Sequence, residues 1–210
     1  MFWFTQGLCF LPAFLVIWSS STFIVAYIIA LFRRDVDIIF PYISDTGAYP
    51  PESCIFGLMT FISACAGIAT IYARYKFVEK LSGDTRVVSP RLNYTALVFG
   101  LLSCLGMCIV ATFQETAVTC VHDIGALMFF VPARLFIAIL AALAFFPTAI
   151  CAYFVKQATL HRDKDDEDYP YHVASASCEW VCAFSFICFF LTYIHDFKLF
   201  TLRVKTEDVE

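Results

Sequence analysis

The sequence has little charge for its length. Asp, Glu, Lys and Arg together make up 15% of the 210 residues, and no basic stripe occurs along the chain. Soluble domains carry about 25% charged residues, and proteins that bind nucleic acid gather Lys and Arg on one face. The low charge therefore excludes an ordinary soluble domain, and nothing in the sequence indicates a nucleic-acid partner.

Motifs for catalysis and for cofactors are also missing. The chain has no G-x-S-x-G turn around a serine nucleophile, and no Gly-rich phosphate loop or H-E-x-x-H pair. Its ten cysteines include no C-x-x-C pair of the kind that binds structural zinc. We therefore expect a protein that is not an enzyme, with no catalytic residues, no cofactor and no resident metal.

Apolar residues are abundant instead. They make up 60% of the chain, and 24 of them are Phe. A spanning helix needs about 20 predominantly apolar residues, which predicts an all-α, polytopic transmembrane helix bundle in one domain, residues 1–205. Four spans are clear from the sequence, at residues 8–32, 54–73, 92–113 and 173–194.

The apolar block 117–155 is ambiguous. It is nearly twice as long as a membrane is thick, and His122, Asp123, Pro132 and Arg134 interrupt it. A chain reversal near Pro132-Ala133-Arg134 would divide it into a short span at 117–131 and a full one at 133–155. The prediction is then five helices of full length plus a shortened or re-entrant fourth. The residues leave open whether the block crosses once or twice.

Lys and Arg in short loops predict the orientation, because they stay in the cytosol. Segment 74–91 holds five of them, whereas 33–53 holds only Arg33 and Arg34 among four acidic residues. This places the N-terminus in the cytosol and 33–53 on the other side. Six crossings, which we favour, put the acidic loop 156–172 on the non-cytosolic side and the tail 196–210 in the cytosol; five crossings reverse both.

Most cysteines lie inside apolar runs, where Cys acts as a small hydrophobe. Cys54 and Cys120 fall instead near predicted non-cytosolic helix ends. An oxidising lumen would permit a disulfide between these two.

The first non-cytosolic loop is rich in residues that form turns. Pro41, Gly47 and Pro50-Pro51 restrict or bend the backbone, and Asp45 can bond nearby backbone groups. Such a loop could cap the mouth of the bundle. Glu52 opens the next helix, where a carboxylate suits the helix dipole.

Polar side chains gather on the non-cytosolic side. Glu179 lies about two turns inside the last span, and an intramembrane carboxylate is costly and usually faces the bundle interior or water. A structural hydrogen bond explains it as well as a functional site does. The candidate functional cluster comprises Asp45, Glu52, His122, Asp123, His172 and Glu179.

Small residues recur at four-residue spacing in two predicted spans. The pairs are Ser63 with Gly67 and Gly100 with Cys104. Small-xxx-small pairs allow close helix packing in membranes, so we interpret them as packing sites.

Several segments together resemble the family of DNA-damage-regulated autophagy modulators, and they are ordered along most of the chain. They are Pro41–Gly47 (PYISDTG), Pro51–Gly57 (PESCIFG), Ala69–Lys76 (ATIYARYK), Ile109–Glu115 (IVATFQE), Val121–Leu127 (VHDIGAL), Tyr171–Trp180 (YHVASASCEW) and Phe190–Phe197 (FLTYIHDF). The resemblance implies six spans, a lysosomal membrane location, promotion of autophagy and a link to stress-induced apoptosis. It also implies that relatives have a full fourth helix and a polar loop after it, which this chain lacks around Pro132-Ala133-Arg134.

Three hypotheses follow. The leading one is a lysosomal membrane protein that promotes autophagy without catalysis, acting through the lipid bilayer or through other lysosomal membrane proteins or transporters. The alternative is a transporter, or transporter subunit, for a small solute or protons that uses Glu179 and His122-Asp123. The third is a lipid hydrolase that holds a metal with His122, Asp123 and His172.

Overall fold

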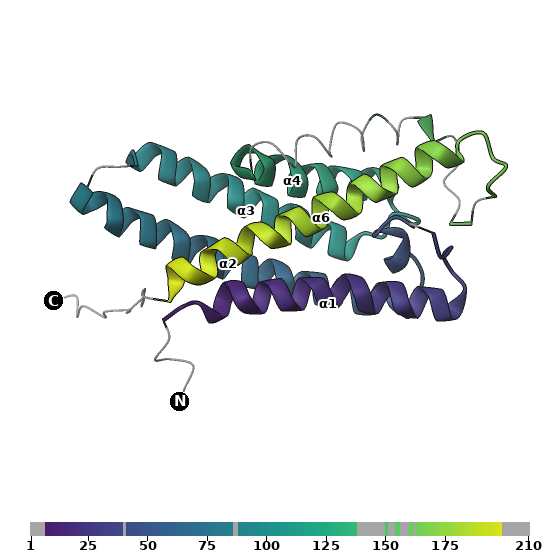
Figure 1. Cartoon of the computed structure of the whole chain (residues 1–210), viewed down its shortest axis with the longest axis horizontal. Helices are drawn as coiled ribbons and strands as arrows, with labels where there is room; N and C mark the ends of the chain where they lie inside the picture. Colours follow the sequence, from purple (N-terminus) through teal and green to yellow (C-terminus); the bar gives the residue numbers. More distant parts are fainter. Residues whose placement is uncertain are drawn as a thin grey trace.

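All regular structure in the described residues is helical. The computed structural model describes residues 7–39, 41–85, 88–137, 150, 154–155, 160–161 and 163–198, with 84–85 and 131–137 described by backbone alone. The elements in this part are α1 (Phe10–Arg33), the 3-10 turn η2 (Asp45–Gly47), α2 (Glu52–Thr85), α3 (Pro90–Thr112), α4 (Thr119–Ile137) and α6 (Tyr169–Phe197) (Figure 1). The predicted all-α fold is confirmed.

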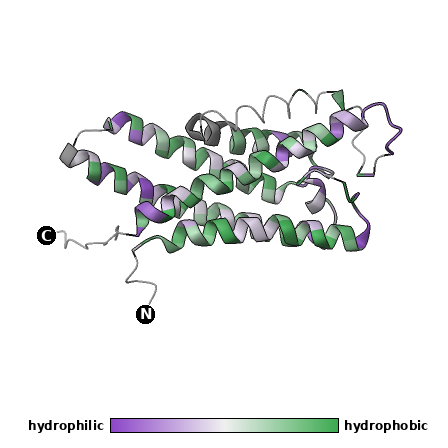
Figure 2. Cartoon of the chain, in the orientation of Figure 1, coloured by the Kyte–Doolittle hydropathy of each residue, from purple (hydrophilic) through white to green (hydrophobic). Residues whose placement is uncertain are grey.

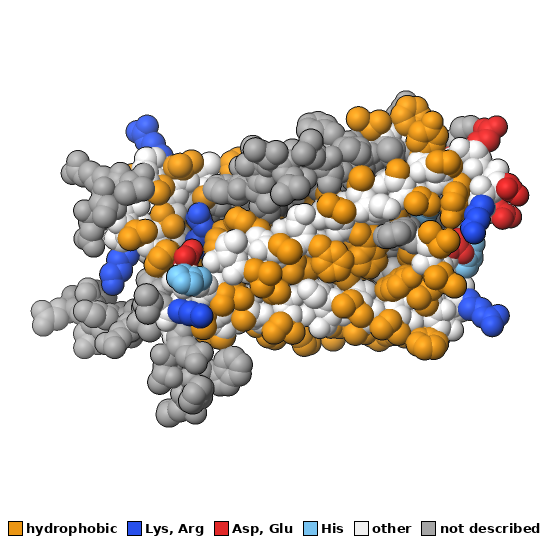
Figure 3. All heavy atoms as spheres, viewed as in Figure 1, with side chains coloured by type: hydrophobic (Ala, Val, Ile, Leu, Met, Phe, Trp, Pro, Cys, Tyr) orange, Lys and Arg blue, Asp and Glu red, His pale blue; other side chains and the backbone are white. Residues whose placement is uncertain are grey.

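Four of these helices, α1, α2, α3 and α6, are long and apolar enough to cross a membrane. Their sides carry exposed apolar side chains such as Ile17, 68% exposed, and Leu58, 63% exposed. Figure 3 shows an apolar belt around the middle of the visible face, with charged side chains at its two ends, and Figure 2 shows the same pattern along the ribbon. Apolar surface of this extent suits lipid rather than water, so the chain is a polytopic helical membrane bundle.

Local sequence explains where the helices begin and end. Ser89 accepts a hydrogen bond from the Leu92 N–H at 3.2 Å, and Pro90 follows it in the first helical turn, so α3 starts there. Arg34, in the left-handed conformation at φ 64°, ends α1. Helix α2 continues beyond the predicted span 54–73 and takes in most of the basic segment, because residues such as Lys76 and Glu79 are good helix formers and pair at 2.8 Å.

The helices connect two chemically different ends of the bundle. At one end the Leu8 N–H donates to the Phe197 carbonyl at 3.1 Å, so the start of α1 lies beside the end of α6. At the other end His161 lies 3.1 Å from Asp37. We call the first the basic end, because it carries Arg74, Lys76, Lys80, Arg91 and Lys198, and the second the acidic end.

This arrangement bears on the number of crossings. Helix α4 leaves the acidic end, and α6 starts again from that end. The loop that precedes α6 therefore shares a side with residues 33–51, as six crossings or a re-entrant hairpin require. Five crossings would put that loop at the basic end.

Helix α4 differs from the expected short span. It runs through Pro132, Ala133 and Arg134 to Ile137, so the chain does not reverse at these three residues. A proline inside a transmembrane helix is tolerated because neighbouring groups can satisfy the freed carbonyl. The predicted span 133–155 falls almost entirely outside the described residues, as does the tail beyond Lys198.

Small residues bring α2 and α3 together. A Cβ at Gly67 would lie 3.0 Å from the Cys104 Sγ, so these members of the two small-xxx-small pairs face one another. Helix α6 packs mainly on α1, and Leu15, Phe190, Tyr193 and Phe197 form a core there with Ala73 of α2. The five helices thereby surround a common interior near the acidic end.

Candidate functional site

A loop caps the acidic end of the bundle, and α6 holds it in place. We call residues 41–48 the capping loop. The backbone N–H of Ile43 donates to Glu179 Oε2 at 2.9 Å, and the indole N–H of the adjacent Trp180 donates to the Pro41 carbonyl, also at 2.9 Å. Two successive side chains of one helix thus bind the loop through its backbone.

The capping loop is also braced from within and from below. Thr46 donates its hydroxyl proton to the Ile43 carbonyl at 2.6 Å. Gly47 packs so closely on Phe56 that a Cβ at position 47 would lie 2.7 Å from its ring. Ile43 is buried in a core with Phe56, Ala26 and Ala183. The loop is therefore packed into the bundle and is not an exposed surface loop.

Tyr42 belongs to the capping loop and packs against α6. Its ring meets the His172 ring edge to face, with 4.9 Å between centroids. Burial raises the pKa of Tyr42 to about 12, and a hydrogen bond with Ser175 opposes part of that rise. The phenol therefore keeps its proton at every physiological pH.

Three carboxylates surround Tyr42. They are Glu179 on α6, Asp45 in the capping loop and Glu115 in the connection between α3 and α4. Their negative charge adds to the rise of the Tyr42 pKa. Asp45 is 8% exposed. The acidic end thus concentrates carboxylates around one neutral phenol.

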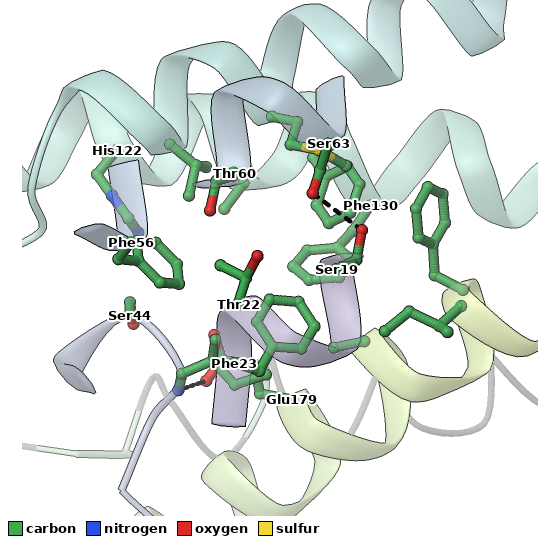
Figure 4. Close-up of a pocket in the computed structure, with 18 residues that line it drawn as sticks. Ser19, Thr22, Phe23, Ser44, Phe56, Thr60, Ser63, His122, Phe130 and Glu179 are labelled. Carbon is green, nitrogen blue, oxygen red and sulfur yellow. Dashed lines mark hydrogen bonds between the residues drawn. The ribbon is translucent and has the colours of Figure 1, made fainter. Parts of the chain in front are cut away.

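A cavity opens below the capping loop. The described helices α1, α2, α3, α4 and α6 line it together with Ile43 and Ser44, and the space between these side chains, counted with the solvent at its mouth, is about 670 Å³. Figure 4 shows Glu179 and Ser44 at the side of the loop, with the aromatic side chains of Phe23, Phe56 and Phe130 around the space. The wall is mostly apolar, with polar groups at a few positions, as in many ligand sites.

Hydroxyl groups from α1 and α2 meet in the wall of this cavity. Ser19 donates to Ser63 at 3.0 Å, and Ser63 donates to the Met59 carbonyl at 3.1 Å. Thr22 bonds the Trp18 carbonyl of its own helix. The buried Thr60 hydroxyl has no hydrogen-bond partner among the described residues. The cavity therefore offers one polar group without a partner.

His122 lies on α4 at the rim of the same cavity. It is 6% exposed, and its Nδ1 is 2.7 Å from the Phe113 carbonyl oxygen. A carbonyl only accepts, so Nδ1 must carry the proton. This hydrogen bond fixes the His122 ring at the rim of the cavity.

The structure divides the predicted cluster. Glu179 and His122 line the cavity, and Asp45 and His172 lie around Tyr42 above it. Asp123 is exposed and does not line the cavity. Glu52 forms a separate pair.

Glu52 is buried at the start of α2. Its side chain is 1% exposed, and Oε2 lies 3.4 Å from the Nε of Arg33, which also binds Asp35 at 3.0 Å. A buried carboxylate usually requires a partner such as this one. The pair ties the end of α1 to the start of α2.

Two further expectations concern metals and disulfides. Among the described residues, no three His, Cys, Asp or Glu side chains lie close enough to hold a metal ion. His122, Asp123 and His172 therefore do not form the ligand set that the hydrolase hypothesis needs. Cys54 and Cys120 are exposed free thiols, so the structure contains no disulfide between them.

Sequence reasoning missed several residues of the site. Tyr42 and Trp180 stand next to residues that it named, but it gave them no role. The run Ser19-Ser20-Ser21-Thr22 in the middle of the first span was a visible signal, because four consecutive hydroxyl residues in an apolar helix indicate a polar interior.

Comparison with known proteins covers nearly the whole chain. The Frag1/DRAM/Sfk1/Cwh43P N-terminal domain matches residues 7–133 and 131–200. Human DNA damage-regulated autophagy modulator protein 1 is 42% identical over 233 residues, which cover 99% of this chain and 98% of that protein. Rat DNA damage-regulated autophagy modulator protein 2 is 39% identical, over 98% of this chain and 89% of that protein.

A more distant relative is the zebrafish modulator of macroautophagy TMEM150B, 28% identical over 90% of this chain and 84% of that protein. No solved structure matches. The family match breaks at residues 131–133, and the alignment with the human relative is longer than the 210 residues of this chain. Both observations agree with residues missing around Pro132-Ala133-Arg134 relative to the relatives.

Proposed function

The chain belongs to the Frag1/DRAM/Sfk1/Cwh43P family, and on this premise we propose that it promotes autophagy from within the lysosomal membrane and links autophagy to stress-induced apoptosis. The observation that carries the proposal is 42% identity, over 99% of the chain, to a protein named as an autophagy modulator. The lysosomal location and the link to apoptosis are proposals of the same kind.

We propose further that the protein acts without catalysis, through the lipid bilayer or through membrane partners. The capping loop and the cavity below it are the part that we assign to this function. Their support is the density of specific contacts there: two side chains of α6 bind the loop, and carboxylates surround Tyr42. Such a fixed surface suits recognition by another membrane protein.

The test is autophagic flux in cells that lack the protein. Flux is measured as the lysosome-dependent turnover of an autophagosome marker, before and after DNA damage. We expect reduced flux after damage, restored by the full chain, and co-fractionation of a tagged chain with lysosomes. Unchanged flux in the deleted cells would refute the proposal.

Orientation can be tested separately. Positive residues at the basic end support a cytosolic N-terminus, and with it a cytosolic C-terminus. A tag after residue 210 should then be open to protease in intact lysosomes, and a tag within 163–167 should be protected. The reverse pattern would contradict this orientation.

A transporter is the second candidate, because Glu179 and His122 line the same cavity. An acidic group and an imidazole beside a membrane cavity are typical of proton-coupled sites. The matching test is proton or small-solute flux into liposomes that hold the purified chain. Glu179→Gln should abolish a flux that depends on this carboxylate, and an equal flux in both proteins would remove the candidate.

A further inference from the structure

A second cavity lies near the basic end, apart from the site described above. Helices α2, α3 and α6 line it, and the space between their side chains, counted with the solvent at its mouth, is about 500 Å³. Arg74, Asn93 and Tyr193 supply its polar groups, and the wall includes Phe186, Phe189 and Phe190. A guanidinium and a run of aromatic rings thus share one space between membrane helices.

Arg74 is held there without an acidic partner. Its guanidinium carbon lies 5.5 Å from the centroid of the Tyr193 ring, within range of a cation–π contact. No carboxylate forms an ion pair with Arg74 among the residues that the structure describes. The side chain is half-buried, and it lines the cavity beside Tyr193.

Asn93 supplies an acceptor that has no donor. Its Nδ2 donates to the Tyr75 carbonyl at 3.0 Å, which fixes the amide. Its Oδ1 is buried and has no hydrogen-bond partner among the described residues, and Asn93 as a whole is 5% exposed. Buried polar atoms are almost always bonded, so this oxygen points to a ligand with a hydroxyl or amine donor.

Polar and apolar groups are ordered along the membrane normal. Tyr193 is two turns nearer the basic end than Phe186, about 10 Å along α6. On α3 Asn93 lies at the rim, and Leu97 lies one turn deeper; the hydroxyl of Ser103, deeper still, donates to the Phe129 carbonyl at 2.7 Å and is not free for an occupant. An occupant would therefore be polar at the membrane surface and apolar toward the middle, which is the arrangement of a lipid.

The surrounding charge favours an anion. Lys76, Lys80 and Arg91 stand at the same end as Arg74. Two carboxylates oppose them: Glu79, which Lys76 binds at 2.8 Å, and Asp196, which acts on Tyr193. Basic pockets between membrane helices are typical of sites for anionic head groups.

We propose that this cavity binds an anionic phospholipid whose head group carries a hydroxyl or amine. Arg74 binds the phosphate, and Asn93 Oδ1 accepts a hydrogen bond from the head-group donor. One acyl chain lies along Phe189 and Phe186. The site does not involve the capping loop, so this proposal can be tested separately from the proposed function.

The test is native mass spectrometry of the purified full chain with phosphatidylserine or phosphatidylcholine at equal concentration. We expect retention of phosphatidylserine and about tenfold weaker binding in Arg74→Gln, because a charge-assisted contact is lost. Lys80→Gln removes the same charge at the same end but not from the cavity wall, and it should bind as the native chain does. Equal losses in both variants would show general attraction and overturn the proposal.

A second variant keeps the test decisive if Arg74→Gln does not fold. Ala96 lines the cavity, and Ala96→Phe should fill it and remove phosphatidylserine while every charge stays in place. Undiminished binding in a folded Ala96→Phe would overturn the proposal. Soluble glycerophosphoserine at millimolar concentration should not displace the lipid; full displacement would mean that the site takes a head group alone and would contradict it.

Discussion

The backbone N–H of Ile43 and the carboxylate of Glu179 lie 2.9 Å apart, although 136 positions separate them in the sequence. The contact joins the first loop at the acidic end to the last helix. It explains an acidic side chain inside a spanning helix, because the carboxyl oxygen has a donor there. It also gives Glu179 a positioning role that does not depend on proton transfer.

Replacement of Glu179 by Ala should loosen the capping loop. A hydrogen bond of this kind contributes about 0.5–1.5 kcal/mol, so opening should become several-fold more frequent. The measurement is the rate at which a maleimide modifies Ser44→Cys, followed by mass spectrometry of that peptide. Glu179→Gln keeps an acceptor oxygen and should label slowly. Equal rates for Ala and Gln would show that the contact does not hold the loop.

Trp180→Phe should weaken the same loop by a different bond. It removes the donor to the Pro41 carbonyl, worth about 1 kcal/mol, and keeps the aromatic packing. Trp18→Phe is the matched control, because Trp18 donates to the Met59 carbonyl at 2.9 Å between α1 and α2. Both variants should lower Tm by a few degrees, but only Trp180→Phe should raise labelling at position 44. The idea fails if both raise it equally.

The sequence predicted the class of fold, and it singled out two residues that line the cavity, Glu179 and His122. Apolar runs located α1, α2, α3 and α6, because burial in lipid requires long uninterrupted hydrophobicity. Glu179 and His122 were found because polar groups are conspicuous in such runs, and Asp45 was found from the turn-forming residues around it. The sequence could not show that Asp123 and His122 have different surroundings, because the two residues are adjacent. Successive residues of a helix point in different directions, so His122 lines the cavity and Asp123 lies at the surface.

Pairings across the bundle were beyond sequence reasoning. The bond from Trp180 to Pro41 depends on how α6 packs against α1, and no local pattern encodes it. Glu52 was interpreted as a helix-capping residue, and it does begin α2, but its ion pair with Arg33 was not predicted. The length of α4 was underestimated because Pro132 reads as a helix end in the rules for soluble proteins, and membrane helices often tolerate it.

The cavity hydroxyls should respond differently to removal. Ser63→Ala leaves Ser19 without its partner and should cost about 1–3 kcal/mol. Thr60→Val removes a buried hydroxyl that has no protein partner and keeps the side-chain shape, so Tm should hold or rise. Thermal unfolding in detergent measures both. A Thr60→Val loss as large as that of Ser63→Ala would mean that Thr60 has a bonded partner in the membrane.

Tyr42 should make stability depend on alkaline pH. Its pKa rises from 10.0 to about 12 in the folded protein, chiefly through burial and further through Glu179, Asp45 and Glu115. Between these values the unfolded chain loses the phenolic proton and the folded chain keeps it. Stability is therefore full below pH 10 and falls as pH rises toward 12.

Tyr42→Phe should flatten that fall. Thermal midpoints between pH 9 and about 11.5 give the slope for each protein. Tyr49→Phe is the control, because Tyr49 is exposed in the same region and its loss should leave the slope as it is. Identical slopes for the native chain and Tyr42→Phe would contradict the burial argument.

The most direct test of the account is rescue of autophagic flux in cells that lack the protein. The native chain and Glu179→Gln should both restore flux after DNA damage, because both hold the capping loop. Glu179→Ala should reach the same membrane in equal amount and fail to restore it. Full rescue by Glu179→Ala, or no rescue by the native chain, would contradict the claim that autophagy is modulated through the loop-capped end of this bundle.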